Sequence, residues 1–170
     1  MSRVERSLFL LINARFFTLA SCLHVGEVWA STVNFVPAFS PLCLVWCSLG
    51  TARHSENIEM CPQVSGSVFM TDIKAPSVLG LDGAQFTGKG REIPREELEK
   101  YYNYFAVNNF PDEALRRKSM PPLTDFTDDP CRRFYELKIK EWWLLDVDCL
   151  LESRIDQRVG VDINSLVGAS

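Results

Sequence analysis

The stretch Pro130–Glu152, PCRRFYELKIKEWWLLDVDCLLE, decides the fold class, because it has the densest apolar content of the C-terminal half. At period two, Glu141 is the only polar residue on a face that otherwise carries Tyr135, Leu137, Ile139, Trp143, Leu145, Val147, Cys149 and Leu151. Such alternation is typical of a half-buried strand. The opposite face is mostly charged, but Trp142, Leu144 and Leu150 interrupt it. Periodicity alone therefore leaves the stretch ambiguous.

Capping and composition favour a helix over the same stretch. Asp129 and Pro130 suit an N-cap and the first helical position. Most of the following residues are good helix formers, and only two are β-branched. No Gly, Asn or Pro follows before Gly160, and strands rarely exceed about 10 residues. We therefore predict a helix over residues 130–157, with a strand over residues 134–151 as the alternative.

Two further helices are predicted upstream. Residues 93–109 place Pro94 in the first turn, followed by Glu96, Glu97 and Glu99, which suit the positive end of a helix dipole. Apolar side chains then recur at three- and four-residue steps, at Leu98, Tyr101, Tyr102, Phe105 and Ala106. Residues 112–118 begin with two acids and end with three bases, which again matches the dipole. The fold class predicted is mainly α, a small helical domain over residues 70–170.

The N-terminal segment, residues 1–69, differs in composition from this domain. Residues 1–70 carry four basic and four acidic side chains, whereas residues 71–170 carry fourteen and eighteen. We interpret residues 1–69 as a leader, an anchor or a weakly ordered tail, with membrane contact through residues 8–52. Val28–Ala52 is uncharged but contains Pro37 and Pro41, which argue against a spanning helix. The expected location is intracellular, membrane-associated or organellar.

Charge, cysteines and glycines exclude several kinds of site. The net charge of −4, with basic residues interleaved among acidic ones, argues against nucleic-acid binding. Cys43, Cys47, His54 and Cys61 lack the Cys-x2-Cys spacing of a zinc site, so we expect the cysteines to be small buried hydrophobic residues in a reducing compartment.

Residues 83–90 match the start of a phosphate-binding loop at Gly83, Gly88 and Lys89. Gly90 replaces the required Ser or Thr, and calcium ligands are missing from the same loop. We expect neither ATP nor calcium dependence, and no cofactor.

One motif carries regulatory content. Arg116-Arg117-Lys118-Ser119-Met120-Pro121 resembles the site preferred by basophilic kinases and the mode-one ligand of 14-3-3 proteins. A phosphate on Ser119 would add nearly two negative charges, which an arginine cluster binds through charge-assisted hydrogen bonds. Basic residues are also common at helix C-termini, where they complement the dipole. The hypothesis is a phosphorylation-dependent docking site for a phosphopeptide-binding protein.

The sequence contains little that predicts catalysis. Its two histidines, His24 and His54, both lie in the apolar N-terminal third. The spacing of serines and cysteines around them does not suggest a Ser-His-Asp or Cys-His catalytic arrangement. Asp146 with Asp148, or the glutamates of residues 96–99, could form acid–base pairs. We predict a non-enzymatic interaction or accessory protein, with Trp142 and Trp143 as core or contact surface. The alternatives are a membrane-associated accessory subunit and a small carboxylate-dependent enzyme.

Overall fold

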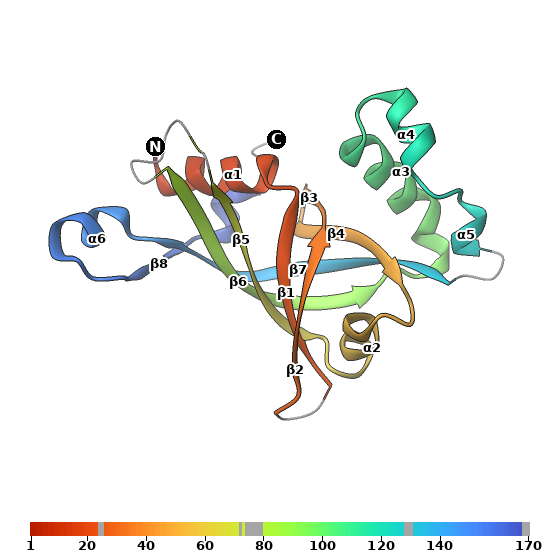
Figure 1. The fold of residues 1–170 in the computed structure, drawn as a ribbon, viewed down its shortest axis with the longest axis horizontal. Helices are drawn as coiled ribbons and strands as arrows, with labels where there is room; N and C mark the ends of the chain where they lie inside the picture. The colour runs from red at the N-terminus through yellow and green to blue at the C-terminus, as the bar shows by residue number, and fades with distance from the viewer. Residues whose placement is uncertain (24–25, 72, 74–79, 128–130, 168–170) are drawn as a thin grey trace.

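Eight antiparallel strands form one sheet in the computed structural model of the chain, which describes residues 1–23, 26–71, 73, 80–127 and 131–167 (Figure 1). The strands are β1 (Phe16–Cys22), β2 (Val28–Asn34), β3 (Val36–Phe39), β4 (Leu42–Leu49), β5 (Gln63–Thr71), β6 (Leu81–Glu92), β7 (Arg132–Leu145) and β8 (Arg158–Val161). Their order is β2-β1-β5-β6-β7-β4-β3, and β8 pairs with β7 beside this path. The long central strands β6 and β7 therefore organise the sheet.

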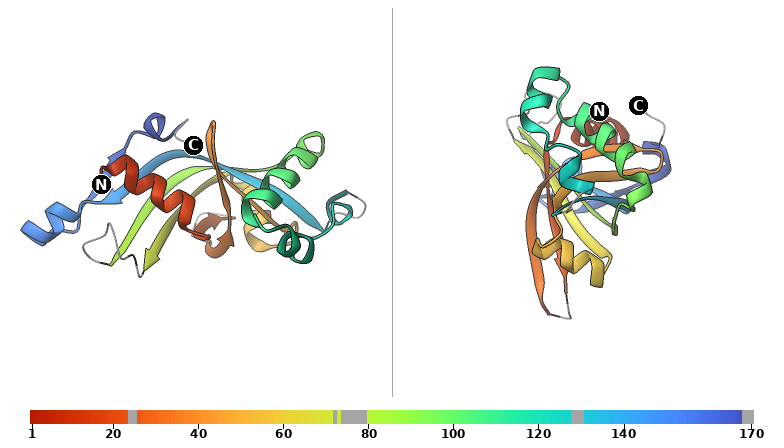
Figure 2. Two further views of the ribbon diagram at one scale, coloured as in Figure 1. Left: turned by 90° about the horizontal axis from the view of Figure 1, so that it is seen from above. Right: turned by 90° about the vertical axis from the view of Figure 1, so that its right-hand side faces the viewer.

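The helices gather at separate places around the sheet. They are α1 (Arg3–Asn13), α2 (Arg53–Met60), α3 (Leu98–Asn109), α4 (Glu113–Ser119), α5 (Thr124–Thr127) and α6 (Val147–Ser153), with 3-10 turns η1 (Arg95–Glu97) and η2 (Ile163–Leu166). Helices α3, α4 and α5 lie together at one end of the molecule and α6 lies at the other (Figures 1 and 2). Helix α1 crosses one face of the sheet, where it contacts β5 and β6.

The sheet curls into an incomplete barrel. Strands β2 and β3 stand at opposite ends of the strand order, yet only Phe35 separates them in the chain. Phe35 is buried, and its N–H donates to the carbonyl of Arg15 at 3.2 Å. Because one residue joins the two outer strands, the edges of the sheet must approach each other there.

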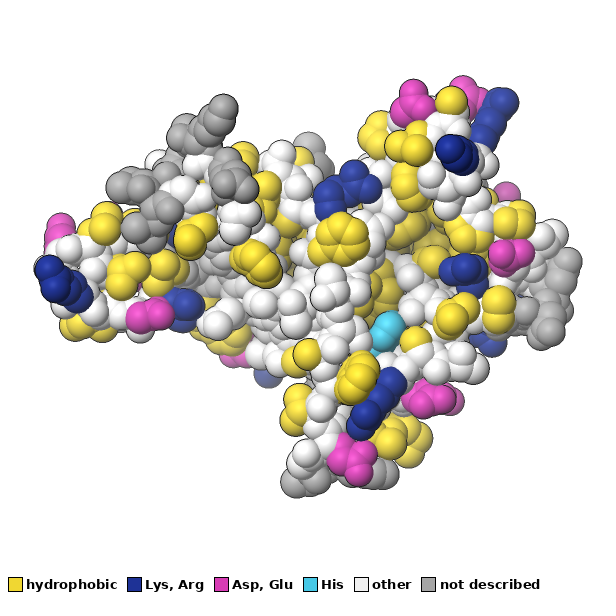
Figure 3. Space-filling model, viewed as in Figure 1, with side chains coloured by type: hydrophobic (Ala, Val, Ile, Leu, Met, Phe, Trp, Pro, Cys, Tyr) yellow, Lys and Arg dark blue, Asp and Glu magenta, His cyan; other side chains and the backbone are white. Residues whose placement is uncertain are grey.

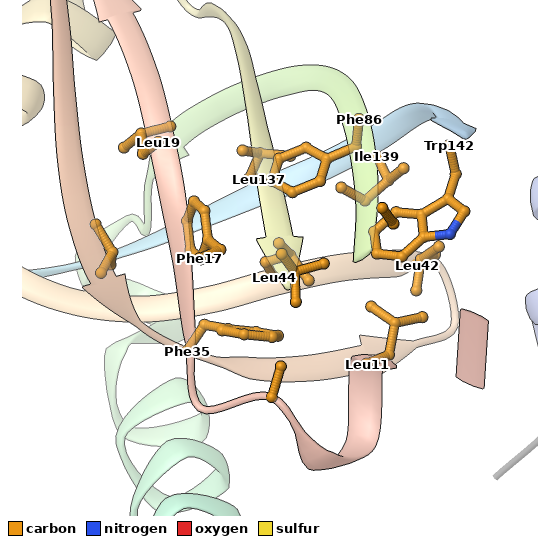
Figure 4. Packing of buried hydrophobic residues seen from close by; sticks show 14 of the residues in the cluster. Leu11, Phe17, Leu19, Phe35, Leu42, Leu44, Phe86, Leu137, Ile139 and Trp142 are labelled. Carbon is orange, nitrogen blue, oxygen red and sulfur yellow. The ribbon is translucent and has the colours of Figure 1, made fainter. Parts of the chain in front are cut away.

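Aromatic and aliphatic side chains fill the barrel (Figure 4). The ring of Phe17 meets Phe35, Trp46 and Phe86 edge to face at centroid distances of 5.5, 5.8 and 5.8 Å. Phe86 in turn stacks on Trp142 at 5.7 Å. A second cluster, which packs α3 and α5 on the outside of the barrel, contains Val36, Val45, Ile93, Leu98, Phe105, Phe126 and Phe134.

The predicted helical fold is wrong, because residues 132–145 form the strand β7. Register explains the ambiguous periodicity: Ile139 pairs with Gly88 and Glu141 pairs with Thr87, so Lys140 is the extra residue of a β-bulge. The inward face therefore carries Tyr135, Leu137 and Ile139 before the bulge and Trp142 and Leu144 after it. The 14-residue strand exceeds the usual length because it pairs with β6, β4 and β8 along different parts.

Asp129 and Pro130, where a helix was expected to start, lie outside the described part of the chain. The helix that does follow is α6, which begins only after β7 has ended. Its N-cap is Asp146, whose carboxylate accepts from the N–H of Cys149 at 3.1 Å. Upstream, α3 and α4 occupy the positions where helices were expected at 93–109 and 112–118.

The apolar residues 1–69 are part of the barrel. They supply α1, α2, β1 to β4 and most of β5, and the uncharged run of residues 28–52 forms β2, β3 and β4. In the described ranges, no helix is long and apolar enough to cross a membrane. The expected membrane association through residues 8–52 is therefore corrected: these residues are apolar because they build a sheet.

Candidate functional site

The start of α2 has no side-chain cap. The chain leaves β4 at Leu49, turns through Gly50 and enters the helix at Arg53. The N-cap is Ala52, which has no polar side chain, so no side-chain hydrogen bond caps this helix. The carbonyl of Ala52 accepts from the N–H groups of Ser55 and Glu56 at 2.8 and 3.1 Å. The positive end of the helix dipole at this start attracts anions.

A cation and an aromatic ring meet at this helix start. The Arg53 guanidinium lies over the ring of Trp29, with 4.6 Å between its central carbon and the ring centroid. Its Nη2 is 3.9 Å from a carboxylate oxygen of Glu27. Arg53 is 47% exposed and Trp29 is 41% exposed, so both remain accessible to a ligand. Residues from β2 and α2 thereby form one cationic, aromatic surface.

Side-chain hydrogen bonds fix α2 on the strands. His54 Nε2 lies 2.9 Å from Ser48 Oγ, and burial lowers the pKa of His54, so its imidazole is neutral near pH 7. Ser55 Oγ donates to the carbonyl of Leu49 at 2.8 Å. Further along, the buried amide of Asn57 donates to Ser21 Oγ at 3.0 Å. The helix start is therefore held in place by both β4 and β1.

A cavity of about 670 Å³ lies between α3 and the strands β3 and β4. Its walls are mostly apolar, and hydrophobic side chains gather in the hollow beside the α3–α5 helices (Figure 3). Arg15, Lys100 and Tyr104 supply polar groups at the cavity. Arg15 Nη2 donates to the Asn109 side-chain oxygen at 2.9 Å, and Tyr104 OH donates to the carbonyl of Pro37 at 2.7 Å. The volume suits a small organic ligand.

Glu136 forms the charged wall of this cavity. It accepts a short hydrogen bond from Tyr101 OH and a bond of 2.7 Å from Arg91 Nε. Burial, and then the hydrogen bond to the Glu136 carboxylate, raise the pKa of Tyr101. Burial also raises the pKa of the Cys43 thiol to about 11. At neutral pH the phenol and the thiol are both protonated, which makes them donors or weakly polar walls and not nucleophiles.

Strand β4 connects the two features. Cys43 lines the cavity near the start of this strand, and Leu49 ends it immediately before the turn to α2. Six residues at about 3.3 Å per residue separate them by roughly 20 Å. The anion-attracting helix start and the apolar cavity therefore lie near opposite ends of β4.

The structure places the predicted regulatory motif on the surface, away from both features. Ser119 is the exposed last residue of α4. Arg116 Nη1 donates to the carbonyl of Phe110 at 3.0 Å, and Arg117 forms an ion pair with Glu113. The carbonyl of Pro121 accepts from Tyr102 OH at 2.8 Å. The two arginines thus already have partners within their own segment.

The two tryptophans point to opposite faces of β7. Trp142 is buried in the barrel, where its Nε1 donates to Ser7 Oγ at 3.0 Å. Trp143 is half-buried on the other face, opposite Gly160 of β8. Trp142 therefore belongs to the core, and only Trp143 offers surface to a partner.

The other predicted residues do not converge on one site. Gly83, Gly88 and Lys89 lie within β6, so they form a strand and no phosphate loop. Within the described ranges, no group of three or more His, Cys, Asp and Glu side chains could hold a metal ion. The Asp146 carboxylate caps α6 while Asp148 is exposed. His24 lies outside the described residues.

Sequence reasoning missed the residues that the structure brings together. Arg53 and Trp29 are 24 positions apart in the chain, and no sequence motif singles out Glu136. One signal was available: the apolar run of residues 42–49 is followed by Gly50 and then by a polar, helix-compatible segment. An uncapped helix directly after a buried strand is a common place for anion binding.

Comparison with known proteins shows which solved structures share this fold. Neither a protein-family model nor a curated protein matches the sequence. Among solved structures, the heme binding protein from Mycobacterium smegmatis matches with a TM-score of 0.67 and 16% identity, over 98% of this chain and 60% of that one. ChuZ from Campylobacter jejuni matches with a TM-score of 0.65 and 16% identity, over 100% of this chain and 63% of that one. A FAD-binding protein from Mesorhizobium loti matches with a TM-score of 0.60 and 15% identity, over 84% of this chain and 92% of that one.

These identities show a shared fold and nothing finer. The chain spans about 60% of the length of the M. smegmatis protein and 63% of that of ChuZ. The incomplete antiparallel barrel, with helices against its outside, is therefore the class to which this chain is similar.

Proposed function

We propose that this chain binds a flavin nucleotide, with the phosphate at the start of α2. The observation that carries the proposal is the Arg53 guanidinium stacked over Trp29 at a helix start that no side chain caps. A phosphate is attracted by a cation and by the positive end of a helix dipole, and arginine binds phosphate oxygens through its planar fork. The likeness to the FAD-binding protein from M. loti supports the same class of ligand.

The remainder of the ligand would extend along β4 toward the apolar cavity. Trp29 provides an aromatic face next to the phosphate position, and the cavity beneath α3 provides apolar walls for a flat ring. Binding sites for such ligands are concave and mostly apolar, with few polar groups that fix orientation. The residues present therefore fit a ligand with one anionic end and one aromatic end.

Titration with two flavins tests the proposal. Flavin mononucleotide and riboflavin share the ring, but only the first carries the phosphate, and binding of either changes flavin fluorescence. Arg53→Ala is expected to weaken mononucleotide binding about 10- to 100-fold, since a hydrogen bond to a charged group contributes roughly 1.5–3 kcal/mol. Riboflavin binding should change little.

Arg117→Ala is the matched control, because Arg117 is also an exposed arginine paired with a glutamate. It should leave the affinities for both flavins unchanged. Equal losses for the two flavins in the Arg53 variant, or no binding of either flavin to the wild-type chain, would contradict the assignment.

Heme is the second candidate, and His54 is the observation that favours it. The imidazole lies next to Arg53 at the same helix start, and its lowered pKa keeps it neutral, as an axial iron ligand must be. The likeness to the M. smegmatis heme binding protein points the same way. Hemin titration should then produce a sharp Soret band that His54→Ala shifts, and flavin titration would show no binding.

The expectations that concern partners and regulation stay predictions. A non-enzymatic accessory role, a protein partner and phosphorylation of Ser119 receive no direct support from the similar structures. Phosphorylation remains testable because Ser119 is exposed on α4. Capture of the phosphorylated chain by a 14-3-3 protein, abolished by Ser119→Ala, is the expected result.

A further inference from the structure

Two cysteines from different elements lie in direct contact. Cys22 is the last residue of β1, and Cys61 is the C-cap of α2. Their sulfur atoms are 3.7 Å apart although the residues are 39 positions apart in the sequence. Both are partly exposed and both are free thiols. In the described structure, which includes all six cysteines, no other pair makes such a contact.

The backbone around the pair is anchored independently of the sulfurs. Cys61 N donates to the carbonyl of Asn57 at 2.7 Å, and the Asn57 side chain holds the helix to Ser21 of β1. Cys22 pairs with Val28 in the β1–β2 ladder. The two thiols therefore lie side by side because α2 is packed on β1. A disulfide requires the sulfurs to close from 3.7 Å to about 2.05 Å, with a Cβ–S–S–Cβ dihedral near 90°.

We propose that Cys22 and Cys61 form a reversible disulfide that ties the end of α2 to the end of β1. The oxidant is a low-molecular-weight disulfide such as oxidised glutathione. One protein thiolate attacks it, forms a mixed disulfide and releases one small thiol; the second protein thiolate then displaces the other. The protein loses two protons and two electrons, and the small disulfide is reduced to two thiols.

The surroundings influence the rate of this step. Contact with Cys61 raises the pKa of the Cys22 thiol, so little thiolate is present at neutral pH. Oxidation should therefore be slow near pH 7 and faster at alkaline pH. Cys43 is buried in the sheet and Cys131 is exposed, and the accessibility of Cys22 and Cys61 lies between these two.

Stability of the oxidised chain gives a second readout. A disulfide that closes a loop of this length constrains the unfolded state, and for a domain of this size the unfolding temperature should rise by about 5–10 °C. Because α2 also begins at Arg53, the bond would hold the proposed anion site more firmly on the barrel. The disulfide itself does not depend on flavin or heme binding.

The experiment oxidises the full chain with oxidised glutathione at alkaline pH, without added cofactor, and maps the bonds by peptide mass spectrometry. The expected result is one peptide pair joining Cys22 to Cys61, lost on reduction, with the rise in unfolding temperature. Cys22→Ser and Cys61→Ser should abolish both, whereas the control Cys131→Ser should leave both intact.

Two results would overturn the inference. One is glutathione attached to Cys22 or Cys61 with no bond between them. The other is a bond that forms equally well after the chain has been unfolded and that leaves the unfolding temperature unchanged, because the folded contact would then have no influence. Either result leaves the flavin and hemin titrations unaffected, so the two proposals fail separately.

Discussion

A hydrogen bond between Ser7 and Trp142 allows a quantitative test of the core. Trp142 Nε1 donates to Ser7 Oγ at 3.0 Å, and Ser7 Oγ donates to the carbonyl of Arg3 at 2.8 Å. Ser7 is 0% exposed and Trp142 is 1% exposed, so water cannot replace the hydroxyl. Ser7→Ala leaves a buried N–H unpaired, which costs about 1–3 kcal/mol. For a domain of this size, about 2 kcal/mol lowers the unfolding temperature by roughly 4–8 °C.

A double-mutant cycle separates this bond from packing. Trp142→Phe removes the donor together with part of the ring, so Ser7→Ala should cost about 1 kcal/mol less in that background. Trp46→Phe is the matched control, because Trp46 is equally buried but its Nε1 has no hydrogen-bond partner among the described residues. In that background Ser7→Ala should keep its full cost.

The assay is urea unfolding followed by far-ultraviolet circular dichroism, which does not rely on the altered tryptophans. The midpoint and slope together give the free energy of unfolding for each member of the cycle. The reasoning would be refuted by a cost of Ser7→Ala below about 0.5 kcal/mol, or by equal coupling of Ser7 to both tryptophans.

Three further predictions concern other contacts. Arg6 donates two hydrogen bonds of 2.8 and 2.7 Å to Asp82 in a largely buried ion pair. Arg6→Ala should lower the free energy of unfolding in urea by about 3–5 kcal/mol, and replacing both residues by apolar ones should lower it less. A side chain at Gly88 would place its Cβ 2.3 Å from a carbonyl of β7, so Gly88→Ala should cost about 3 kcal/mol, whereas Gly160→Ala, with its nearest atom at 3.7 Å, should cost far less. Burial lowers the pKa of His54 below the unfolded value of 6.5. The stability that this group contributes is therefore complete above pH 6.5 and is lost as the pH falls through the folded pKa. The free energy of unfolding should be lower at pH 5 than at pH 7.5, and His54→Gln should reduce this difference.

Local signals predicted the helices of residues 93–118 because caps and apolar stripes act within a few residues. They failed at β7, where the alternation is shifted by the bulge at Lys140. That bulge depends on β6, in which Gly88 allows the close approach of the β7 backbone. The deciding interaction joins segments about fifty residues apart, so neither periodicity nor capping within residues 130–152 contains it.

The N-terminal segment was misjudged for a related reason. Residues 42–49 carry no charge because β4 is covered on both faces. Leu44 and Trp46 point into the barrel, while Val45 packs beneath α3. A strand buried on both sides has the same composition as a membrane segment of similar length, and the two differ only in what surrounds them.

The candidate site depends on topology even more strongly than the fold does. Trp29 and Arg53 meet because β2 runs along one open edge of the barrel and α2 packs against it. In the described structure β2 pairs with β1 and β3 pairs with β4, while Phe35 joins the two edges at one end only. Helix α2 contacts β2 at one edge, and helix α3 contacts β3 at the other. A closed barrel would have bonded these edges to each other. The helix start with its arginine lies beside β2 and the apolar cavity lies beneath α3, so an elongated ligand with one anionic end would extend along β4 from one to the other.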